Sequence, residues 1–179
     1  MKWRGDQLFT LEDIIKPGLN ILFFGCNPAQ VSVDKGHYHQ GGFGKALWGL
    51  MRRFGFIPPD AQPGREDDYL LARAIGMTDI VKKPGPNCRK VDPQDYDHGR
   101  PQLIELLRKN QPIRVVCGVY KYAMEALLEE KIHHYGHLGK RLGLESEFFV
   151  PPFPPGKGRN DAIIGREFVA LERSAFDAR

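Results

Sequence analysis

The chain has 179 residues, of which 41% are hydrophobic and 27% are charged, and its formal net charge is +4 at pH 7. This length suits one domain with a buried core, so we expect a single domain over residues 1–179. No apolar run approaches the roughly 20 residues that cross a bilayer, and residues 1–6 lack the apolar segment of a signal peptide. We therefore expect a cytoplasmic protein that does not bind membranes.

Short apolar runs alternate along the chain with segments of helical spacing. The runs predict strands because glycine or proline bounds them. We expect strands over residues 19–24, 77–81, 115–117 and 148–150. We expect helices over residues 45–54, 67–73, 101–109, 123–128 and 161–176, the last capped by Asn160 or Asp161.

This alternation is typical of an α/β sandwich with a mostly parallel central sheet. Functional groups of such a fold gather in the loops at the carboxyl ends of the strands. Three loops of this kind attract attention: those that follow Gly25, Asp79 and Val150.

Three cysteines, Cys26, Cys88 and Cys117, are scattered without CxxC spacing. This pattern does not favour a disulfide framework, a zinc ribbon or an iron–sulfur cluster. Cys117 lies in an apolar run and is interpreted as a small buried residue. We expect Cys26, at a strand end, to be structural as well.

The first loop begins with Asn27 and Pro28. An asparagine amide can hold a water through its donor and its acceptor, although Asn-Pro is also a common turn initiator. Further along the loop, Tyr38 and His39 offer flat rings that suit stacking on a base, or they are ordinary loop side chains. A zinc site from His37 and His39 lacks evident further ligands, so we do not expect one.

The second loop follows Asp79. With an ordinary pKa of about 3.9, this carboxylate is expected to be ionised at neutral pH. It is suited to orienting a water or accepting a hydrogen bond from a base, and the alternative is a simple turn or helix cap.

The third loop reads PFPPGKGRND over residues 152–161. Its prolines stiffen the backbone, its glycines allow close approach, and its cations can meet phosphate. The same sequence also fits a plain surface loop. Basic pairs in other loops favour a phosphate partner only if they surround one mouth. These pairs are Lys82-Lys83, Arg89-Lys90 and Lys140-Arg141.

Together these loops resemble the uracil-DNA glycosylase superfamily, and within it the mismatch-specific uracil/thymine branch. The matches follow the family's order from residue 17 to the final helix. They are GCNPA at 25–29, KGHYH at 35–39, GMTDIVKK at 76–83, GRPQLI at 99–104, GVYKY at 118–122 and PFPPGKGR at 152–159. Ala29 replaces the family's usual glycine, Pro155 replaces its serine, and only Trp48 survives of one helix-start motif.

The resemblance implies a three-layer α/β/α sandwich with a four-stranded, mostly parallel sheet. It implies hydrolysis of the bond between uracil, or thymine or a related damaged base, and deoxyribose in mismatched double-stranded DNA, after the base is flipped out. The expected protein is a monomer of bacterial type associated with the nucleoid. No metal or cofactor is implied.

The resemblance also implies roles for residues. Asn27 positions the attacking water and Asp79 is a candidate base for that water. Base-binding positions are Gly25, Cys26, Pro28, Tyr38 and His39, with backbone N–H groups near Cys26 and Tyr38 facing the base oxygens. DNA-binding positions are Pro155, Gly156, Lys157, Gly158 and Arg159.

Two other functions remain open at this point. One is a non-catalytic module of the same fold that binds uracil or DNA. The other is a hydrolase of free nucleosides or nucleotides, against which the wedge-like third loop argues.

Overall fold

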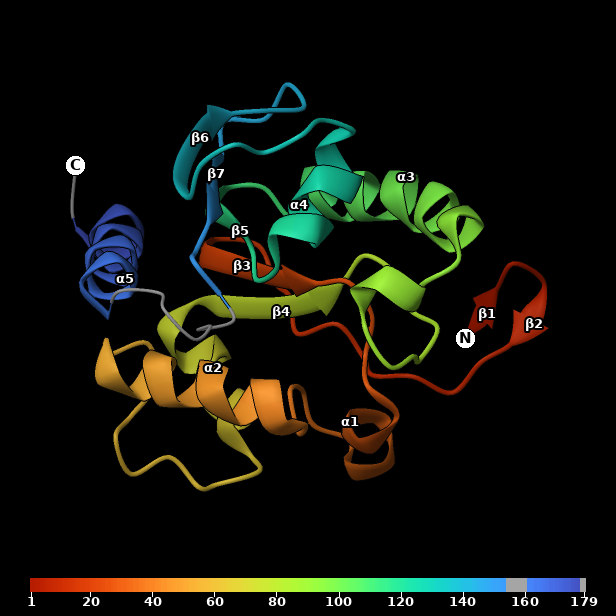
Figure 1. Ribbon diagram of the computed structural model, residues 1–179, viewed down its shortest axis with the longest axis horizontal. Coiled ribbons are helices and arrows are strands. Elements are labelled where there is room, and N and C mark those ends of the chain that lie inside the picture. Colours follow the sequence, from red (N-terminus) through yellow and green to blue (C-terminus); the bar gives the residue numbers. More distant parts are fainter. Residues whose placement is uncertain (154–160, 178–179) are drawn as a thin grey trace.

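A five-stranded sheet forms the centre of the computed structural model, which describes residues 1–153 and 161–177 (Figure 1). Its strand order is β4-β3-β5-β7-β6. The first four in this order are parallel: β4 (Ile75–Asp79), β3 (Leu19–Gly25), β5 (Ile113–Gly118) and β7 (Glu147–Val150). The edge strand β6 (Gly136–Lys140) pairs antiparallel with β7. The mostly parallel sheet is confirmed, with five strands instead of four because the glycine-rich β6 has no apolar run.

Helices cover both faces of this sheet (Figure 1). Alternation along β3 explains why: Ile21 and Phe23 join one buried cluster, whereas Leu22 and Phe24 join another. The first cluster includes residues of α2 (Gly42–Arg53) and α5 (Asp161–Phe176). The second includes residues of α3 (Pro93–Lys109) and α4 (Lys121–Leu128). The three-layer α/β/α sandwich is therefore confirmed.

The helix boundaries differ from the expected ones mainly at α3. This helix starts at Pro93, not at 101, because Asp92 caps it by accepting a hydrogen bond from the backbone N–H of Gln94. Pro101 lies inside the helix. The expected helix over 67–73 is two short 3-10 turns, η1 (Glu66–Tyr69) and η2 (Leu71–Arg73). Two short helical elements in the described part of the chain were not expected, α1 (Gln30–Lys35) and η3 (Cys88–Lys90).

The N-terminal segment, for which we had predicted no structure, docks on the sandwich. It begins with a two-stranded ribbon, β1 (Lys2–Trp3) and β2 (Asp6–Gln7), set apart from the sheet in Figure 1. Further on, Ile14 forms an antiparallel bridge with Met77 on the outer edge of β4. This bridge brings Leu11 and Asp13 near the carboxyl end of β4. Among the helices that the structure describes, none is long and apolar enough to span a membrane.

Candidate active site

The carboxyl ends of β3 and β4 lie side by side at one end of the sheet. Gly25 and Asp79 are direct partners in the parallel register, so the loops that follow them start at the same edge. A pocket of about 840 Å³ opens there. Its lining includes Asn27 and Asp79, and also Phe153 from the loop after β7. The structure thus brings together the first two predicted loops and, of the third, the described residue Phe153.

Asp79 is buried in this pocket, with 5% of its surface exposed. Burial raises the pKa of its carboxyl to about 8; the nearby Lys82 lowers this pKa and Asp13 raises it. The expectation that Asp79 is ionised at neutral pH is therefore wrong for the free protein. The cause is desolvation, which the sequence alone does not reveal.

Gly25 makes the position of this carboxyl possible. A Cβ atom on Gly25 would lie 2.3 Å from Oδ1 of Asp79, which is far inside van der Waals contact. The carboxyl therefore sits directly over the backbone of the neighbouring strand. Any side chain at residue 25 would expel it.

Asn27 follows the same strand end and lines the pocket. Its Nδ2 atom is buried, and no residue in the described part of the chain accepts a hydrogen bond from it. A buried amide donor without an acceptor is costly. Because Asn27 itself lines the pocket, this unpaired donor lies beside the space that a ligand would occupy.

Pro28 and Cys26 tie the first loop to the segment after β4. The carbonyl of Pro28 accepts a hydrogen bond from the N–H of Gly85 at 2.9 Å. Cys26 forms a disulfide with Cys88, with the two Cα atoms 5.3 Å apart. The prediction that the cysteines form no disulfide is wrong for this pair, because 62 residues separate two thiols that the fold makes adjacent. The prediction for Cys117, a buried free cysteine, is confirmed.

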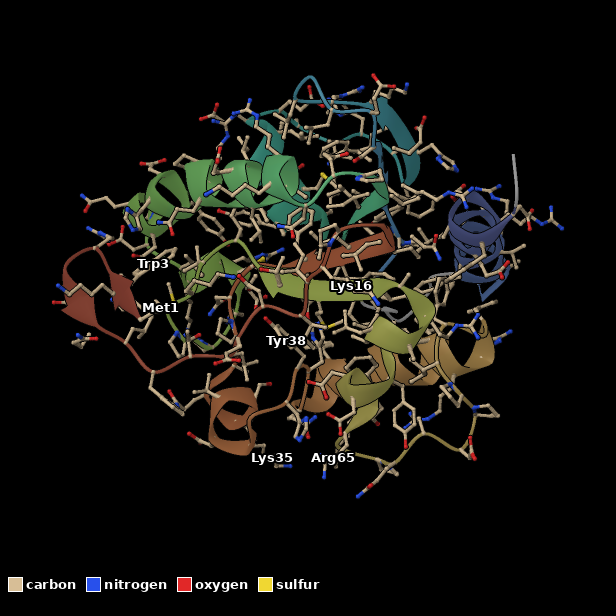
Figure 2. All side chains as sticks on the ribbon, turned by 180° about the vertical axis from the view of Figure 1, so that it is seen from behind. Met1, Trp3, Lys16, Lys35, Tyr38 and Arg65 are labelled. Carbon is tan, nitrogen blue, oxygen red and sulfur yellow. A yellow bond between two sulfur atoms is a disulfide. The ribbon has the colours of Figure 1, made fainter. Side chains whose placement is uncertain are left out.

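Tyr38 lies between the sheet and α1 (Figure 2) and is 4% exposed. Its backbone N–H donates to Asp67 Oδ2 at 2.7 Å, and its hydroxyl donates to the carbonyl of Glu12 at 3.2 Å. The N–H of Tyr38 is therefore already used, so this one of the backbone N–H groups near Tyr38 does not face a base oxygen. The hydrogen bond that fixes the backbone of Tyr38 is made to Asp67, 29 residues further along the chain.

His39 also lines the pocket, in a left-handed backbone conformation with φ of 54°. Burial lowers the pKa of its imidazole to about 4, so the ring is neutral at pH 7. Its Nε2 atom is buried without a hydrogen-bond partner among the residues that the structure describes. His39 and Asn27 thus share the property of an unpaired polar atom at the same pocket.

Several residues that we had assigned no role hold this loop in place. The indole N–H of Trp48 donates to the carbonyl of Tyr38, and the hydroxyl of Ser32 accepts from the N–H of Gln40. A Cβ atom on Gly44 would lie 1.9 Å from the carbonyl oxygen of His39. Only Trp48 gave a signal in the sequence, as the surviving residue of a motif.

His37 interacts with acidic residues that, like His37 itself, are not among those that line the pocket. Its Nδ1 lies 2.8 Å from Asp67 Oδ1 and 3.8 Å from Asp68 Oδ1. Arg65 already pairs with Asp68, and Asp67 already accepts the N–H of Tyr38. We interpret this cluster as a brace for the loop.

The basic loop pairs do not all surround the pocket. Lys82 is hydrogen bonded to Asp13 and Thr78. At the end of the edge strand β6, Lys140 pairs with Glu145 and Arg141 pairs with Glu130. Arg89 and Lys121 do line the pocket. The expected DNA-binding residues all lie outside the described residues. They are Pro155, Gly156, Lys157, Gly158 and Arg159.

A pocket at the carboxyl edge of a mostly parallel sheet is the usual ligand-binding place of α/β folds. A sequence model of the Uracil DNA glycosylase superfamily matches residues 12–166. The chain therefore belongs to this superfamily, whose activity is that of a DNA glycosylase, an N-glycosyl hydrolase that acts on DNA. The match covers all the pocket residues discussed above.

Proposed function

We propose that this DNA glycosylase removes uracil, or thymine or a related damaged base, from mismatched double-stranded DNA. The observation that carries the proposal is the convergence in one pocket of Asn27, with its unpaired amide, and Asp79, with its buried carboxyl. Both groups belong to strand ends fixed by the register of β3 and β4.

Base flipping follows from the position of these groups. A base stacked in a duplex cannot reach a carboxyl that is 5% exposed. The target nucleotide must therefore leave the helix and enter the pocket, at a cost of a few kcal/mol that is lowest for a mismatched base. The pocket volume of about 840 Å³ is within the usual range for a small-molecule site.

The chemical step uses one water. Asn27 holds this water, and ionised Asp79 takes its proton as the oxygen bonds to C1′ of the deoxyribose. The bond from C1′ to the base nitrogen breaks, and the base leaves with the electron pair. Only the ionised fraction of Asp79 performs this step, which is a minor fraction at pH 7 because its pKa is about 8.

His39 is the better candidate of the two aromatic residues for contacting the base. Tyr38 is held by its N–H, its carbonyl and its hydroxyl, whereas the neutral His39 ring has a free polar atom. We assign His39 to stacking or hydrogen bonding with the flipped base and Tyr38 to shaping the wall. Arg89 and Lys121 at the pocket are suited to nearby phosphates.

Single-turnover excision from duplexes that carry one G·U or G·T pair, or one other lesion, tests the proposal. Alkali then cleaves the abasic sites. Wild-type protein should excise uracil from the G·U duplex, and Asn27→Ala and Asp79→Ala should slow excision while the far-ultraviolet circular dichroism stays unchanged.

Two outcomes would contradict this proposal. A shift of the duplex without abasic product would indicate a binding module. Release of base from free deoxyuridine, with no steep salt dependence of DNA binding, would indicate a nucleoside hydrolase.

A further inference from the structure

The first two loops of the site are joined by more than packing. The N–H of Val81 donates to the carbonyl of Cys26 at 2.8 Å, and the N–H of Gly85 donates to the carbonyl of Pro28 at 2.9 Å. The disulfide to Cys88 is the third link. These three links grip the residues on both sides of Asn27.

The second loop also touches the amide of Asn27 directly. A Cβ atom on Gly85 would lie 2.7 Å from Nδ2 of Asn27, so the glycine backbone forms one wall for this amide. The hydroxyl of Tyr96 in α3 donates to the carbonyl of Cys88 at 3.0 Å. The Cys88 end of the disulfide is thus anchored to α3, while its other end, Cys26, is the residue before Asn27.

We infer that the Cys26–Cys88 disulfide and Gly85 form a positioning element that holds the Asn27 amide, and that excision depends on the oxidation state of this cysteine pair. This inference rests on the proposed function for its effect on excision. Misplacing a reacting group by about 1 Å can cost 10²-fold in rate. The two backbone hydrogen bonds remain after reduction, so the loops loosen without separating.

The redox step is an ordinary thiol–disulfide exchange. A thiolate of a small dithiol attacks a sulfur of the pair, and its second thiol then releases the protein. The protein gains two electrons and two protons as two thiols, and the dithiol becomes a cyclic disulfide. Cys88 is half-buried and lines the pocket, whereas Cys26 is 1% exposed, so Cys88 offers the accessible sulfur.

Dithiothreitol is the probe for the first experiment. Reduction, verified by mass after alkylation of a sample, should slow single-turnover excision by wild-type protein roughly tenfold. Cys88→Ser should show the slow rate with and without the reductant. In both reduced wild type and Cys88→Ser, amide hydrogen exchange should accelerate in residues 26–28 and 85–88.

A glycine pair supplies the second experiment. Gly85→Ala presses on Asn27 Nδ2, the end of a side chain that can turn away, so the urea midpoint should hold while the excision rate falls about 10²-fold. Gly49→Ala in α2 is the matched control, because no atom lies within 4 Å of a Cβ there. Gly49→Ala should leave the rate unchanged.

The outcomes separate this inference from the proposed function. Active wild-type protein with equal rates in the oxidised and reduced forms, or unchanged exchange in the two loops, would overturn the inference alone. Protein that excises no base from any duplex would refute the proposed function. The exchange measurement would still decide whether the pair positions the loops.

Discussion

Two buried carboxyl groups of this protein, those of Asp95 and Asp79, have different surroundings. Asp95 in α3 is 3% exposed, and it accepts hydrogen bonds from the indole N–H of Trp3 at 2.8 Å and from Arg4 at 3.1 Å. Asp79 is 5% exposed in the pocket, and no donor in the described part of the chain contacts its carboxyl group. Asp95 docks the N-terminal ribbon, whereas Asp79 borders open space for a ligand.

The comparison shows that the role of a buried carboxyl group depends on whether hydrogen-bond donors contact it. A buried carboxylate that is paired joins two segments of the chain, since its charge is met by donors. A buried carboxyl that is unpaired keeps its proton to higher pH and is free to exchange that proton with a substrate. On this basis we propose that Asp79 acts in the chemistry of the site and that Asp95 stabilises the fold.

Replacing each acid by its amide tests this contrast most strongly. Asp79→Asn removes the proton acceptor, so single-turnover excision should fall by roughly 10³-fold. Asp95→Asn should change excision by less than about threefold because it touches only the ribbon and α3. Equal losses in the two variants would remove the distinction between them.

The pH profile of excision sharpens the same prediction. For wild-type protein, kcat/KM should rise about tenfold per pH unit below pH 8 and level off above it, since only ionised Asp79 accepts the proton and its pKa is about 8. Asp79→Asn should lose this dependence. A wild-type profile that is flat between pH 6 and 8 would contradict the assigned role.

Gly44 tests the backbone on which the pocket is built. Gly44→Ala places a methyl group 1.9 Å from the original position of the His39 carbonyl oxygen, so the loop that carries His39 must move. We expect a loss of about 10²-fold in excision. Gly49→Ala in the same helix is the control. Similar rates for the two variants would show that the position of His39 does not matter.

The sequence predicted the part of this site that backbone register dictates. The apolar run at 19–24 and the strand near 77–81 place Asn27 and Asp79 at one edge, because parallel strands end together. The sandwich follows from the same periodicity. The boundaries were less accurate, as at α3, where two prolines each fit a helix start and Pro93 begins the helix.

The part that depends on contacts distant in sequence could not be predicted. The bond of Cys26 to Cys88, the brace of Asp67 on Tyr38 and the raised pKa of Asp79 all arise only when the chain folds. The disulfide, the hydrogen bond and the pKa shift each depend on which residues lie beside one another in the folded protein, and no local sequence pattern records that. Likewise, the importance of Gly85 and Gly44 is visible only in the structure, which shows the atoms that a Cβ at each position would contact.

The raised pKa of Asp79 makes the stability of the protein depend on pH. The folded protein disfavours ionised Asp79, whose pKa is about 8, whereas the unfolded chain ionises this group near pH 3.8. Asp79 thus reduces the free energy of unfolding progressively between pH 4 and 8, and by a constant amount above pH 8.

Asp79→Asn removes this loss, so at pH 9 its free energy of unfolding in urea should exceed that of wild type by several kcal/mol, since each unit of pKa shift corresponds to about 1.4 kcal/mol. At pH 4 the difference should vanish. Asp95→Asn should instead lower the free energy of unfolding, because Arg4 loses one of its two ion pairs and keeps only that with Asp92. A difference between Asp79→Asn and wild type that does not vary with pH would contradict the raised pKa of Asp79.

The two buried tryptophans extend the comparison to single hydrogen bonds, one beside the pocket and one at the ribbon. Trp48 donates to the carbonyl of Tyr38 at 3.3 Å beside the pocket, and Trp3 donates to Asp95 at 2.8 Å at the ribbon. Each Trp→Phe change deletes one hydrogen bond and should lower the free energy of unfolding by about 1 kcal/mol. Only Trp48→Phe should also slow excision, by less than about fivefold, because the carbonyl of Tyr38 keeps its bond from the Gln40 amide. A slower rate in Trp3→Phe would mean that the ribbon, too, acts on the pocket.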